Sequence, residues 1–429
     1  RIITVDLWSK GSDYQKALNI TALFIFMVSS LLVAGRAADR FGRRKVFLSG
    51  LLLYGAAGIV AGSIPIIWVL ILCRSLQGVA IAMLSPSGLA MSLKEFPPSR
   101  RAYALGVWGT IGALTGLCGS PVAAAMIELF NWQAIFMLTG GFALLILIAG
   151  LIVLSDEQEG SSQLPIDWVS AIIAILAVGG LTLFLVQGQE WGFKSPVTIF
   201  CLCISIIAIP LLVKRNSKQK YPLFPPAIFA QRSFTVGATG SALCQVGFFS
   251  IYFGLPLYMR EVWSWSPLKI GFALIPLNVI PLMTAAIAGK IVDRQGPRPM
   301  VIFGGIWSGI SFLVIGFFLM ESGYILFALG LLISGLGAMA IGNNTTIATL
   351  LDIEDGLLAS ASSASYTARR LGSALGAVLT ASIVGNRLGA EFKDVYIWVW
   401  ILGAGAYLLG SLITYLYYPR RDEEQTQNV

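Results

Sequence analysis

Two short charged stretches of the chain share one spacing of glycine, aspartate and arginine. Residues 35–45 read GRAADRFGRRK and residues 289–299 read GKIVDRQGPRP. Both follow the frame G-x-x-x-D-R-x-G-x-R, and both lie between two long apolar segments. We call residues 35–44 the first frame and residues 289–298 the second frame. A recurrence on this scale predicts that about half of the chain is duplicated.

The residue types of the frame suit a charged turn between two antiparallel helices. Glycine permits the tight turn, and an aspartate can accept hydrogen bonds from a helix N-terminus or pair with an arginine. A single copy would also fit ordinary basic anchors at a membrane surface, an explanation that two copies with the same spacing disfavour. The frame residues with a predicted role are Gly35, Asp39, Arg40, Gly42, Arg43, Arg44, Gly289, Asp293, Arg294, Gly296 and Arg298.

A lone arginine, Arg74, lies inside the apolar segment 67–91. A charge deep in a bilayer costs about 2.5–3.5 kcal/mol on insertion scales, so it normally has a role and a partner. The alternative is a side chain that snorkels to the interface. Gln77 is one turn further on and could line the same cavity. All 21 acidic residues fall in predicted loops, tails or helix ends, so an acidic partner would lie upstream of Arg1 or at a helix end such as Glu128.

Small residues recur at spacings of three and four in two apolar segments. In one segment they are Gly109, Gly112, Gly116, Gly119 and Ala123, and in the other Ser360, Ala364, Ala368, Gly372 and Gly376. These spacings put each set on one face of a helix, which predicts close packing against a neighbouring helix. Arg369 and Arg370 adjoin the second set.

Polar and aromatic residues inside the apolar segments are candidates for a substrate site. They are Trp108, Gln245, Phe248, Tyr252, Asn278, Asn343, Asn344 and Arg369. For any single aromatic residue, packing is the simpler explanation, whereas the adjacent amides of Asn343 and Asn344 need hydrogen-bond partners in an apolar run. An interior without acidic residues disfavours strongly cationic ligands relative to neutral or anionic ones.

The composition indicates that membrane-spanning helices position the candidate residues. Of the 429 residues, 56% are hydrophobic and only 12% are charged, and the mean hydropathy is +0.80; a soluble domain usually carries about 25% charged residues. The chain is predicted to be an all-α polytopic membrane protein, because its apolar runs are long and do not alternate like barrel strands. Thirteen spanning helices are predicted, at 15–35, 46–64, 67–91, 103–127, 132–154, 166–187, 196–214, 233–257, 267–290, 299–319, 323–350, 359–385 and 395–418.

Lysine and arginine in the loops predict the orientation. If residues 36–45 are cytoplasmic, 18 basic residues fall on that side and 8 on the other, although the acidic loops 155–165 and 351–358 carry none. The C-terminus is then cytoplasmic and the first helix starts outside. Thirteen crossings with this polarity predict that a further helix precedes Arg1.

Polar stretches divide the predicted helices into three groups. The segments SDEQEGSSQLP (155–165) and KRNSKQKYPLFPP (214–226) flank two helices. The expected order is an N-terminal bundle at 1–154, two linker helices with their flanking loops at 155–232, and a six-helix bundle with a C-terminal tail at 233–429. The repeated frame predicts that the two bundles are pseudo-symmetric.

Several classes of function are disfavoured by the residue types present. There is no histidine, and all five cysteines lie in apolar runs, so neither a metal site nor another cofactor is predicted. The sequence offers no phosphate-cradling loop or soluble domain for an enzyme. Basic residues are dispersed in short loops and do not gather on one soluble face, which disfavours nucleic acid as a partner.

These patterns together resemble the major facilitator superfamily. Its cytoplasmic signature, between the second and third helices of a six-helix bundle, is similar to GRAADRFGRRK, and RSLQG (74–78) matches its fourth-helix R-x-x-Q-G signature. The segments QGQEWGFKSP (187–196), LPLYMREVWSWSPLKIGFALIP (255–276) and YTARRLGSALG (366–376) resemble the 14-helix drug:proton antiporters of the superfamily. The fifth-helix signature matches imperfectly: Ser120 stands where proline is expected, Pro121 is one place late, and Ala123 and Ala124 replace a glycine pair.

The resemblance implies both residue roles and a function. The two frames would form a latch that stabilises one transport conformation. Arg74, Gln77 and Gly78 would take part in proton coupling, and Gly109, Gly112, Gly116, Gly119 and Pro121 would form the antiporter signature. The implied function is proton-coupled export of small amphipathic compounds by alternating access, carried out by a monomer in the cell membrane. The alternatives are gradient-independent transport of an anionic metabolite or lipid-like molecule, and a membrane scaffold that does not transport.

Overall fold

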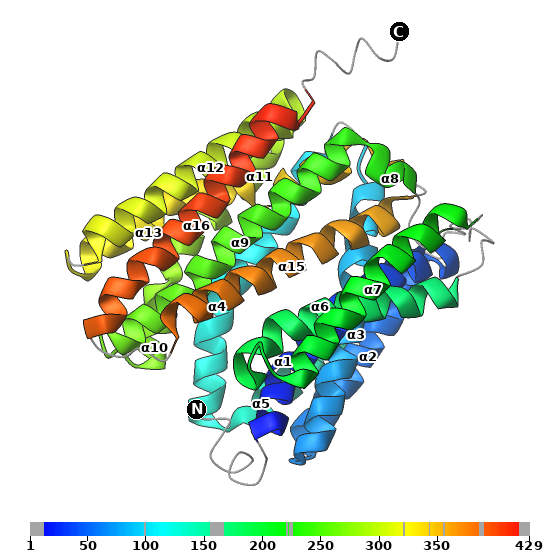
Figure 1. The fold of residues 1–429 in the computed structure, drawn as a ribbon, viewed down its shortest axis with the longest axis horizontal. Coiled ribbons are helices and arrows are strands. Elements are labelled where there is room, and N and C mark those ends of the chain that lie inside the picture. Colours follow the sequence, from blue (N-terminus) through cyan, green and yellow to red (C-terminus); the bar gives the residue numbers. More distant parts are fainter. Residues whose placement is uncertain are drawn as a thin grey trace. The chain divides into compact units, whose positions relative to one another are not determined.

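The structure is a computed structural model in which the regular elements are helices (Figure 1). It describes residues 13–97, 100–154, 167–219, 222, 226–320, 322–342, 344–354, 357–385 and 390–419, and no strand occurs among them. The longer helices are α1 (Asp13–Phe41), α2 (Arg43–Ser63), α3 (Ile67–Lys94), α4 (Arg101–Leu129), α5 (Trp132–Val153), α6 (Trp168–Trp191), α7 (Pro196–Lys218), α9 (Arg232–Glu261), α11 (Ile275–Gln295), α12 (Pro297–Val314), α13 (Tyr324–Ile341), α15 (Leu358–Val384) and α16 (Ala390–Tyr417). The shorter ones are α8 (Pro226–Ala230), α10 (Pro267–Ala273), the π-helix η3 (Ile315–Leu319) and α14 (Asn344–Leu350).

The all-α membrane fold predicted from composition is confirmed. Within the described part of the chain, ten helices are long and apolar enough to cross a membrane, or eleven if the two halves of α11, bent by 52°, count as one span. The predicted segments 15–35 and 359–385 also form helices, α1 and α15. The second of these is rich in serine and contains two arginines, which lowers its hydropathy.

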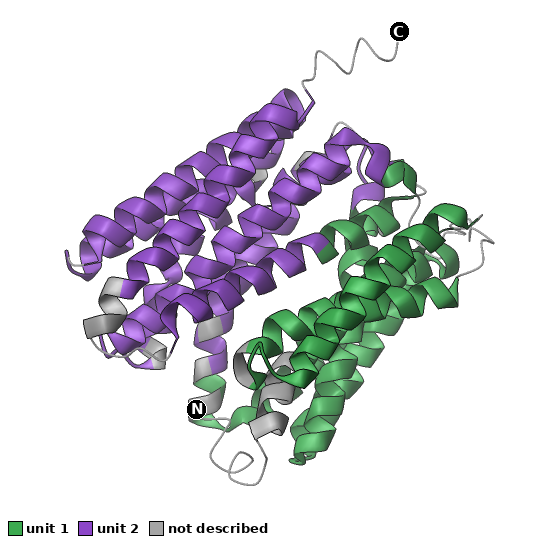
Figure 2. Ribbon diagram, in the orientation of Figure 1, with its two compact units in different colours: residues 1–92, 125–228, 354–367 green, residues 93–124, 229–353, 368–429 purple. Residues whose placement is uncertain are grey.

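Contacts between Cα atoms group the chain into two compact units (Figure 2). Unit 1 comprises residues 1–92, 125–228 and 354–367, and unit 2 comprises residues 93–124, 229–353 and 368–429. Four helices therefore contribute to both units: α3 changes unit after Ser92, α4 after Ala124, α8 after Ile228 and α15 after Thr367. The division into 1–154, 155–232 and 233–429 stays a prediction about the order of the chain.

Unit 1 is built on pairs of neighbouring helices. Helix α2 packs against α5, and α1 packs against both α2 and α6. The backbones of α2 and α5 approach closely where Gly58 meets Gly140, because a side chain at Gly58 would lie 2.8 Å from the Cα of Gly140. Small residues permit this kind of contact between membrane helices.

The two helices predicted as linkers pack together within unit 1, as the green ribbons α6 and α7 show in Figure 1. Ala174 and Ala177 of α6 form a buried cluster with Ala208 and Leu212 of α7, and Leu32 of α1 packs on this cluster. At the start of α6, Asp167 caps the helix and accepts hydrogen bonds from Arg215 of α7 at 3.0 and 3.1 Å. The linker helices are thus joined to α1 by apolar packing and to each other by an ion pair.

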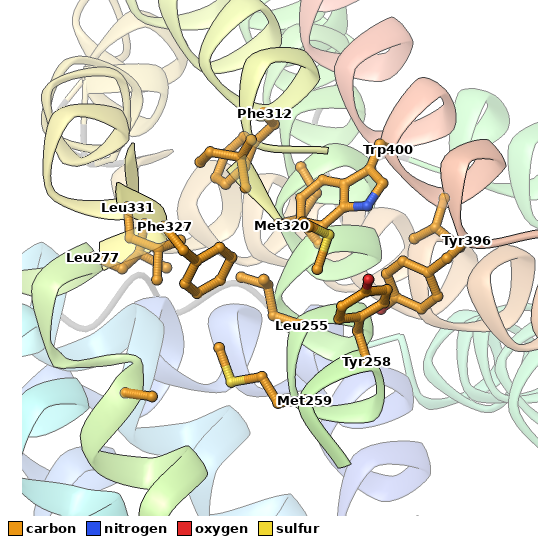
Figure 3. Close-up of a cluster of buried hydrophobic side chains, with 14 of the residues drawn as sticks. Leu255, Tyr258, Met259, Leu277, Phe312, Met320, Phe327, Leu331, Tyr396 and Trp400 are labelled. Carbon is orange, nitrogen blue, oxygen red and sulfur yellow. The ribbon is translucent and has the colours of Figure 1, made fainter. Parts of the chain in front are cut away.

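Unit 2 has a continuous apolar core, part of which is drawn in Figure 3. Helix α16 packs against α9 and α12, and α13 packs against α11 and α12. Large side chains fill the space between them, among them Leu255, Phe327 and Trp400, each no more than 1% exposed. Burial on this scale fixes the positions of the polar residues that the same helices carry.

Candidate functional site

The two frames form the same turn in the two units. In the first frame α1 ends at Phe41 and α2 begins at Arg43; in the second, α11 ends at Gln295 and α12 begins at Pro297. The intervening glycines, Gly42 and Gly296, have φ of 92° and 78°, a conformation that favours glycine. Their N–H groups donate to the carbonyls of Ala38 at 3.1 Å and Val292 at 2.8 Å. The predicted tight turns are therefore present.

The aspartate of the first frame contacts the start of α15. The Ser360 hydroxyl donates to Oδ2 of Asp39 at 2.5 Å, and the backbone N–H of Ser360 also bonds to this carboxylate. Ser360 is the third residue of α15, where helix N–H groups have no intrahelical partner and the helix dipole is positive. Arg36 and Arg43 add electrostatic attraction from the same frame.

Asp39 lies beyond the end of the predicted span 15–35, on the loop side. Burial raises the pKa of its carboxyl group to about 6, against the opposing effects of Ser360, Arg43 and Arg36. The group is thus mostly ionised at neutral pH and becomes protonated in mild acid. Both states leave it able to accept a hydrogen bond, but only the ionised state attracts the arginines.

The aspartate of the second frame makes the corresponding contact with α4. The backbone N–H of Tyr103 donates to Oδ2 of Asp293 at 3.1 Å, and Tyr103 is the third residue of α4. The ammonium of Lys290 lies 5.4 Å from the centre of the Tyr103 ring. Each frame therefore directs its carboxylate at the first turn of a helix that contributes to both units.

The last arginine of each frame contacts the opposite end of another helix. Arg44 donates to the carbonyl of Leu151 at 3.3 Å, and Arg298 donates to the carbonyl of Tyr415 at 2.7 Å. Leu151 and Tyr415 are each the third residue from the end of their helices, α5 and α16. Cations are favourable at helix C-termini because the terminal carbonyls have no intrahelical partner.

The remaining frame residues differ in how far they are buried. Gly35 and Gly289 are buried, and Arg43 is also buried. The guanidinium of Arg40 lies 5.3 Å from the centre of the Phe41 ring. Arg294 is exposed.

Arg74 of α3 lies against an aromatic ring. Its guanidinium is 4.5 Å from the centre of the Phe136 ring, and no ion pair involves it among the described residues. Gln77 is only 1% exposed, and its amide oxygen has no hydrogen-bond partner in the described part of the chain. A side chain at Gly78 would collide with the backbone of Leu23. Gly78 thus permits close packing of α3 on α1, and the carboxylate expected beside Arg74 stays a prediction.

The two small-residue faces differ from each other. A side chain at Gly112 or Gly119 of α4 would meet nothing within 4 Å, and one at Gly116 would lie 3.4 Å from Oδ1 of Asn278. The close packing predicted for this face is therefore not found at Gly112 and Gly119 in the described structure. Gly109 is partly buried, and Pro121 lies within α4.

The face on α15 is packed as predicted. Side chains at Gly372 and Gly376 would collide with the backbone of Ala242 and Val246 on α9. The hydroxyl of Ser250 on α9 also donates to the carbonyl of Gly376 at 3.3 Å. This close approach brings the polar residues of α9 and α15 within hydrogen-bonding distance.

One group of predicted substrate residues is brought together in unit 2. With its amide oxygen toward α15, Gln245 accepts hydrogen bonds from Nε and Nη2 of Arg369 at 3.2 and 3.1 Å. Nη1 of Arg369 donates to the Thr346 hydroxyl of α14 at 2.5 Å. The rings of Phe248 and Tyr252 are stacked, with centroids 5.3 Å apart.

The other substrate candidates are not joined to this group by any hydrogen bond among the described residues. Asn344, at the start of α14, is buried and donates to the carbonyl of Ala340 near the end of α13 at 2.9 Å. Its amide therefore has the partner that an apolar run requires. Asn343 lies outside the described residues. Trp108 of α4 is 37% exposed, and Asn278 is partly buried beside Gly116.

Comparison with known protein families gives a match over most of the chain. A sequence profile of the Major Facilitator Superfamily matches residues 9–213 and 237–429. The chain belongs to the major facilitator superfamily. Membership indicates a multi-pass membrane transporter and confirms the family predicted from the repeated frame.

Relatives within the superfamily include proteins named for export. A tetracenomycin C resistance and export protein of Streptomyces glaucescens is 26% identical, covering 91% of this chain and 72% of that protein. The multidrug export protein EmrB of Escherichia coli (strain K12) is 25% identical, covering 86% of this chain and 72% of that protein. The predicted resemblance to drug-exporting members of the superfamily is thus confirmed.

Solved structures agree on the fold. The proton:xylose symporter XylE aligns with a TM-score of 0.67 at 15% identity, covering 96% of this chain and 88% of that chain. The human organic anion transporter MFSD10 aligns with a TM-score of 0.65 at 16% identity, covering 93% of this chain and 83% of that chain. At these identities the likeness establishes the superfamily fold alone.

Sequence reasoning missed the partners of the frame residues. Ser360 entered only as a small residue on a helix face, and Tyr103 and Thr346 did not enter at all. A signal was available for Ser360 and Tyr103, because each is near the start of a predicted helix, at 359 and 103, where N–H groups are available to a carboxylate. No local pattern connects Thr346 with Arg369, which is 23 residues away.

Proposed function

We propose that the chain is a secondary active transporter that exports small amphipathic compounds by proton-coupled alternating access. The observation that carries this proposal is that both frames direct a carboxylate at the first turn of a helix shared between the two units. The relatives named for drug resistance and export support the direction and the class of substrate.

In this proposal the frames act as a latch for one transport conformation. Hydrogen bonds to a charged group contribute about 1.5–3 kcal/mol each. A free-energy difference of a few kcal/mol is enough to change which of two conformations predominates. Release of Asp39 from Ser360 and of Asp293 from Tyr103 would free the first turns of α15 and α4. Both helices could then move relative to the frames during the transport cycle.

We also propose which residues take part in proton coupling and how the protein lies in the membrane. Arg74 and Gln77 take part in proton coupling, because a charge, together with an amide oxygen that has no hydrogen-bond partner among the described residues, indicates a functional site in an apolar helix. The glycine face of α4 with Pro121 belongs to the antiporter signature. The protein is a monomer in the cell membrane, with its C-terminus in the cytoplasm, and its ligands are a small molecule and protons.

A second candidate is gradient-independent transport of an anionic or lipid-like compound. Each acidic residue that the structure describes lies outside a helix or within five residues of a helix end. A transporter that binds and releases protons in the membrane usually employs an acidic or histidine side chain there. A scaffold without transport activity is the third alternative.

Flux measurements in liposomes separate these candidates. The purified protein is reconstituted, the vesicles are loaded with a fluorescent amphipathic compound, and efflux is followed with and without an imposed pH gradient. Flux that needs the gradient and is abolished by a protonophore is expected. Flux that ignores the gradient would favour the second candidate. If correctly folded protein gives no more flux than empty vesicles across a panel of compounds, the chain is not a transporter of this kind.

A further inference from the structure

Arg74 is one of the few basic residues in the interior of the described helices. Among the described lysines and arginines, only Arg74, Arg369 and Arg370 lie more than six residues from both ends of their helix. Arg74 is the eighth residue of α3 (Ile67–Lys94), so about 10 Å of helix separate it from the first residue. A charge at that depth is costly and needs a group that holds it.

The ring of Phe136 on α5 faces the Arg74 guanidinium. The guanidinium carbon lies over the ring, 4.5 Å from its centre, and an aromatic face attracts a cation within about 6 Å. Among the described residues, the Arg74 side chain has no ion pair and no hydrogen bond. The ring is therefore the main contact that the structure shows for this charge.

Packing fixes the Phe136 ring in its place. Phe136 is only 5% exposed and belongs to a buried cluster that includes Leu70 and Cys73 of α3 and two alanines of α2. Trp132, one turn earlier on α5, makes an edge contact with the ring, with centroids 5.8 Å apart and an interplanar angle of 89°. Because the ring is held on several sides, it sets the position of the guanidinium that lies on it.

The amide of Gln77 is an acceptor that the guanidinium does not use in this conformation. Gln77 is three residues after Arg74 and thus on the same face of α3. It is 1% exposed, and its Oε1 has no hydrogen-bond partner among the described residues. The ring thus holds the guanidinium although a buried oxygen lies one turn away. A carboxylate forms a stronger contact than a neutral ring and can displace it.

We infer that Phe136 is a positioning residue, which holds the Arg74 guanidinium ready for the carboxylate with which it takes part in proton coupling. The inference rests on the proposed proton-coupled export and names a residue that controls the coupling. In this cycle the guanidinium leaves the ring for the ionised carboxylate. It returns to the ring when that carboxylate takes up a proton, so the arginine has a favourable contact in both states.

Fluorinated phenylalanines at position 136 test the electrostatic part of this contact. Each added fluorine withdraws electron density from the ring face with little change in size, so the attraction for a cation weakens in steps. Efflux is measured in proteoliposomes under a pH gradient, with the fluorescent compound that the wild-type protein exports. Its rate should fall stepwise through the monofluoro, difluoro and trifluoro rings, by about threefold to tenfold in total. The affinity for the compound should stay within about twofold.

The same series at Phe327 is the matched control. Phe327 is a fully buried ring of unit 2 that packs against Trp263, and no cation lies over it among the described residues. Fluorination there should leave the efflux rate unchanged. Phe136→Leu should lower the rate as much as the trifluoro ring does, and it should have no further effect in a protein that already carries Arg74→Gln. Thermal unfolding of each variant checks that it folds.

Fluorine NMR observes the contact without transport. With para-fluorophenylalanine at position 136, the signal should move on Arg74→Gln, and it should move by more than the signal of the same label at position 327. Equal shifts at the two positions would overturn the inference.

The outcomes separate this inference from the proposed function. Gradient-driven efflux that does not respond to fluorination at position 136 would overturn the inference and leave the proposed function standing. An equal response at Phe327 would also overturn it, because it would indicate a structural role for both rings. A wild-type protein without gradient-driven efflux would contradict the proposed function and the coupling role together, whereas the NMR response would still establish that the ring holds Arg74.

Discussion

The two frames are built alike but differ in how their carboxylates are held. Asp39 bonds to both the hydroxyl and the backbone N–H of Ser360, and Arg36 and Arg43 lie close enough to attract it. Asp293 accepts the backbone N–H of Tyr103. The shared element is the N–H of the third residue of a helix, which any residue except proline supplies. The hydroxyl of Ser360 is a side-chain donor to the first frame.

The Asp39–Ser360 contact depends on the residue type at position 360, whereas the Asp293–Tyr103 contact uses a backbone group. A backbone donor is insensitive to the side chain at Tyr103, whereas the hydroxyl at Ser360 is lost in most substitutions. If the latch hypothesis is correct, substitution of the partner residue should weaken the first-frame contact more than the second-frame contact.

The largest effect is expected for Asp39→Asn. The substitution removes the charge that attracts Arg36 and Arg43 and weakens the bonds from Ser360. Losing about 1.5–3 kcal/mol from one conformation changes its population by a factor of about 10 or more. Transport per molecule in proteoliposomes should fall by about tenfold, with normal insertion and a monodisperse elution profile. Unchanged turnover in the well-folded variant would contradict the latch hypothesis.

The effect of Asp39→Asn on transport should depend on pH. The pKa of Asp39 is raised to about 6, so its ionised form and its attraction to the arginines are present above that pH and are lost as the pH falls through it. The wild-type and Asp39→Asn proteins should therefore differ most at pH above about 7 and become similar near pH 5. The ratio of their transport rates at equal pH gradients measures this effect. A ratio that does not vary with pH would show that Asp39 does not titrate in this range.

Asp293→Asn should have a smaller effect than Asp39→Asn. It removes a charge from the first turn of α4, where the helix dipole favours an anion by about 0.3–1 kcal/mol, and the amide oxygen of the new side chain can still accept the backbone N–H of Tyr103. We expect transport to fall about threefold to fivefold under the same assay. If this variant is the more impaired of the two, the first frame is not the dominant contact.

The donors themselves can be compared by Ser360→Ala and Tyr103→Phe. Ser360→Ala removes the hydroxyl but keeps the backbone bond, so a loss of about threefold in transport is expected. Tyr103→Phe keeps both the backbone donor and a ring for Lys290, and it should resemble the wild-type protein. A strong defect in Tyr103→Phe would mean that its hydroxyl, not its backbone N–H, is the important group.

The smallest effect on transport is expected at Asp167, an acidic residue outside both frames. Hydrogen bonds from Arg215 lower its pKa to about 2, so its ion pair contributes stability above pH about 4, and this contribution disappears as the pH falls toward 2. Asp167→Asn should lower the melting temperature slightly at neutral pH, since a partly exposed ion pair contributes about 1 kcal/mol or less. Transport should be unchanged. A transport defect equal to that of Asp39→Asn would show that any loss of charge impairs this protein.

Much of the fold could be predicted from the sequence because it depends on local patterns. Ten of the thirteen predicted segments each coincide with one helix, whereas 267–290, 299–319 and 323–350 are each divided between two helices, namely α10 and α11, α12 and η3, and α13 and α14. The turns at Gly42 and Gly296 are where the frame places them. The packing of Gly372 and Gly376 against α9 also follows from their spacing. For Gly112 and Gly119 the spacing defines a helix face but does not state what covers it.

The sequence by itself determined the membrane class, the helices, the repeated frame and the scarcity of charge in the helix interior. These properties follow from hydropathy, spacing and composition, which are local. Only the tertiary structure decided that Asp39 contacts Ser360, that Asp293 contacts Tyr103, and that Gln245 and Thr346 orient Arg369. The two frame contacts join residues 321 and 190 positions apart in the chain. Such pairings depend on how whole helices pack, and packing is a property of the complete set of apolar faces.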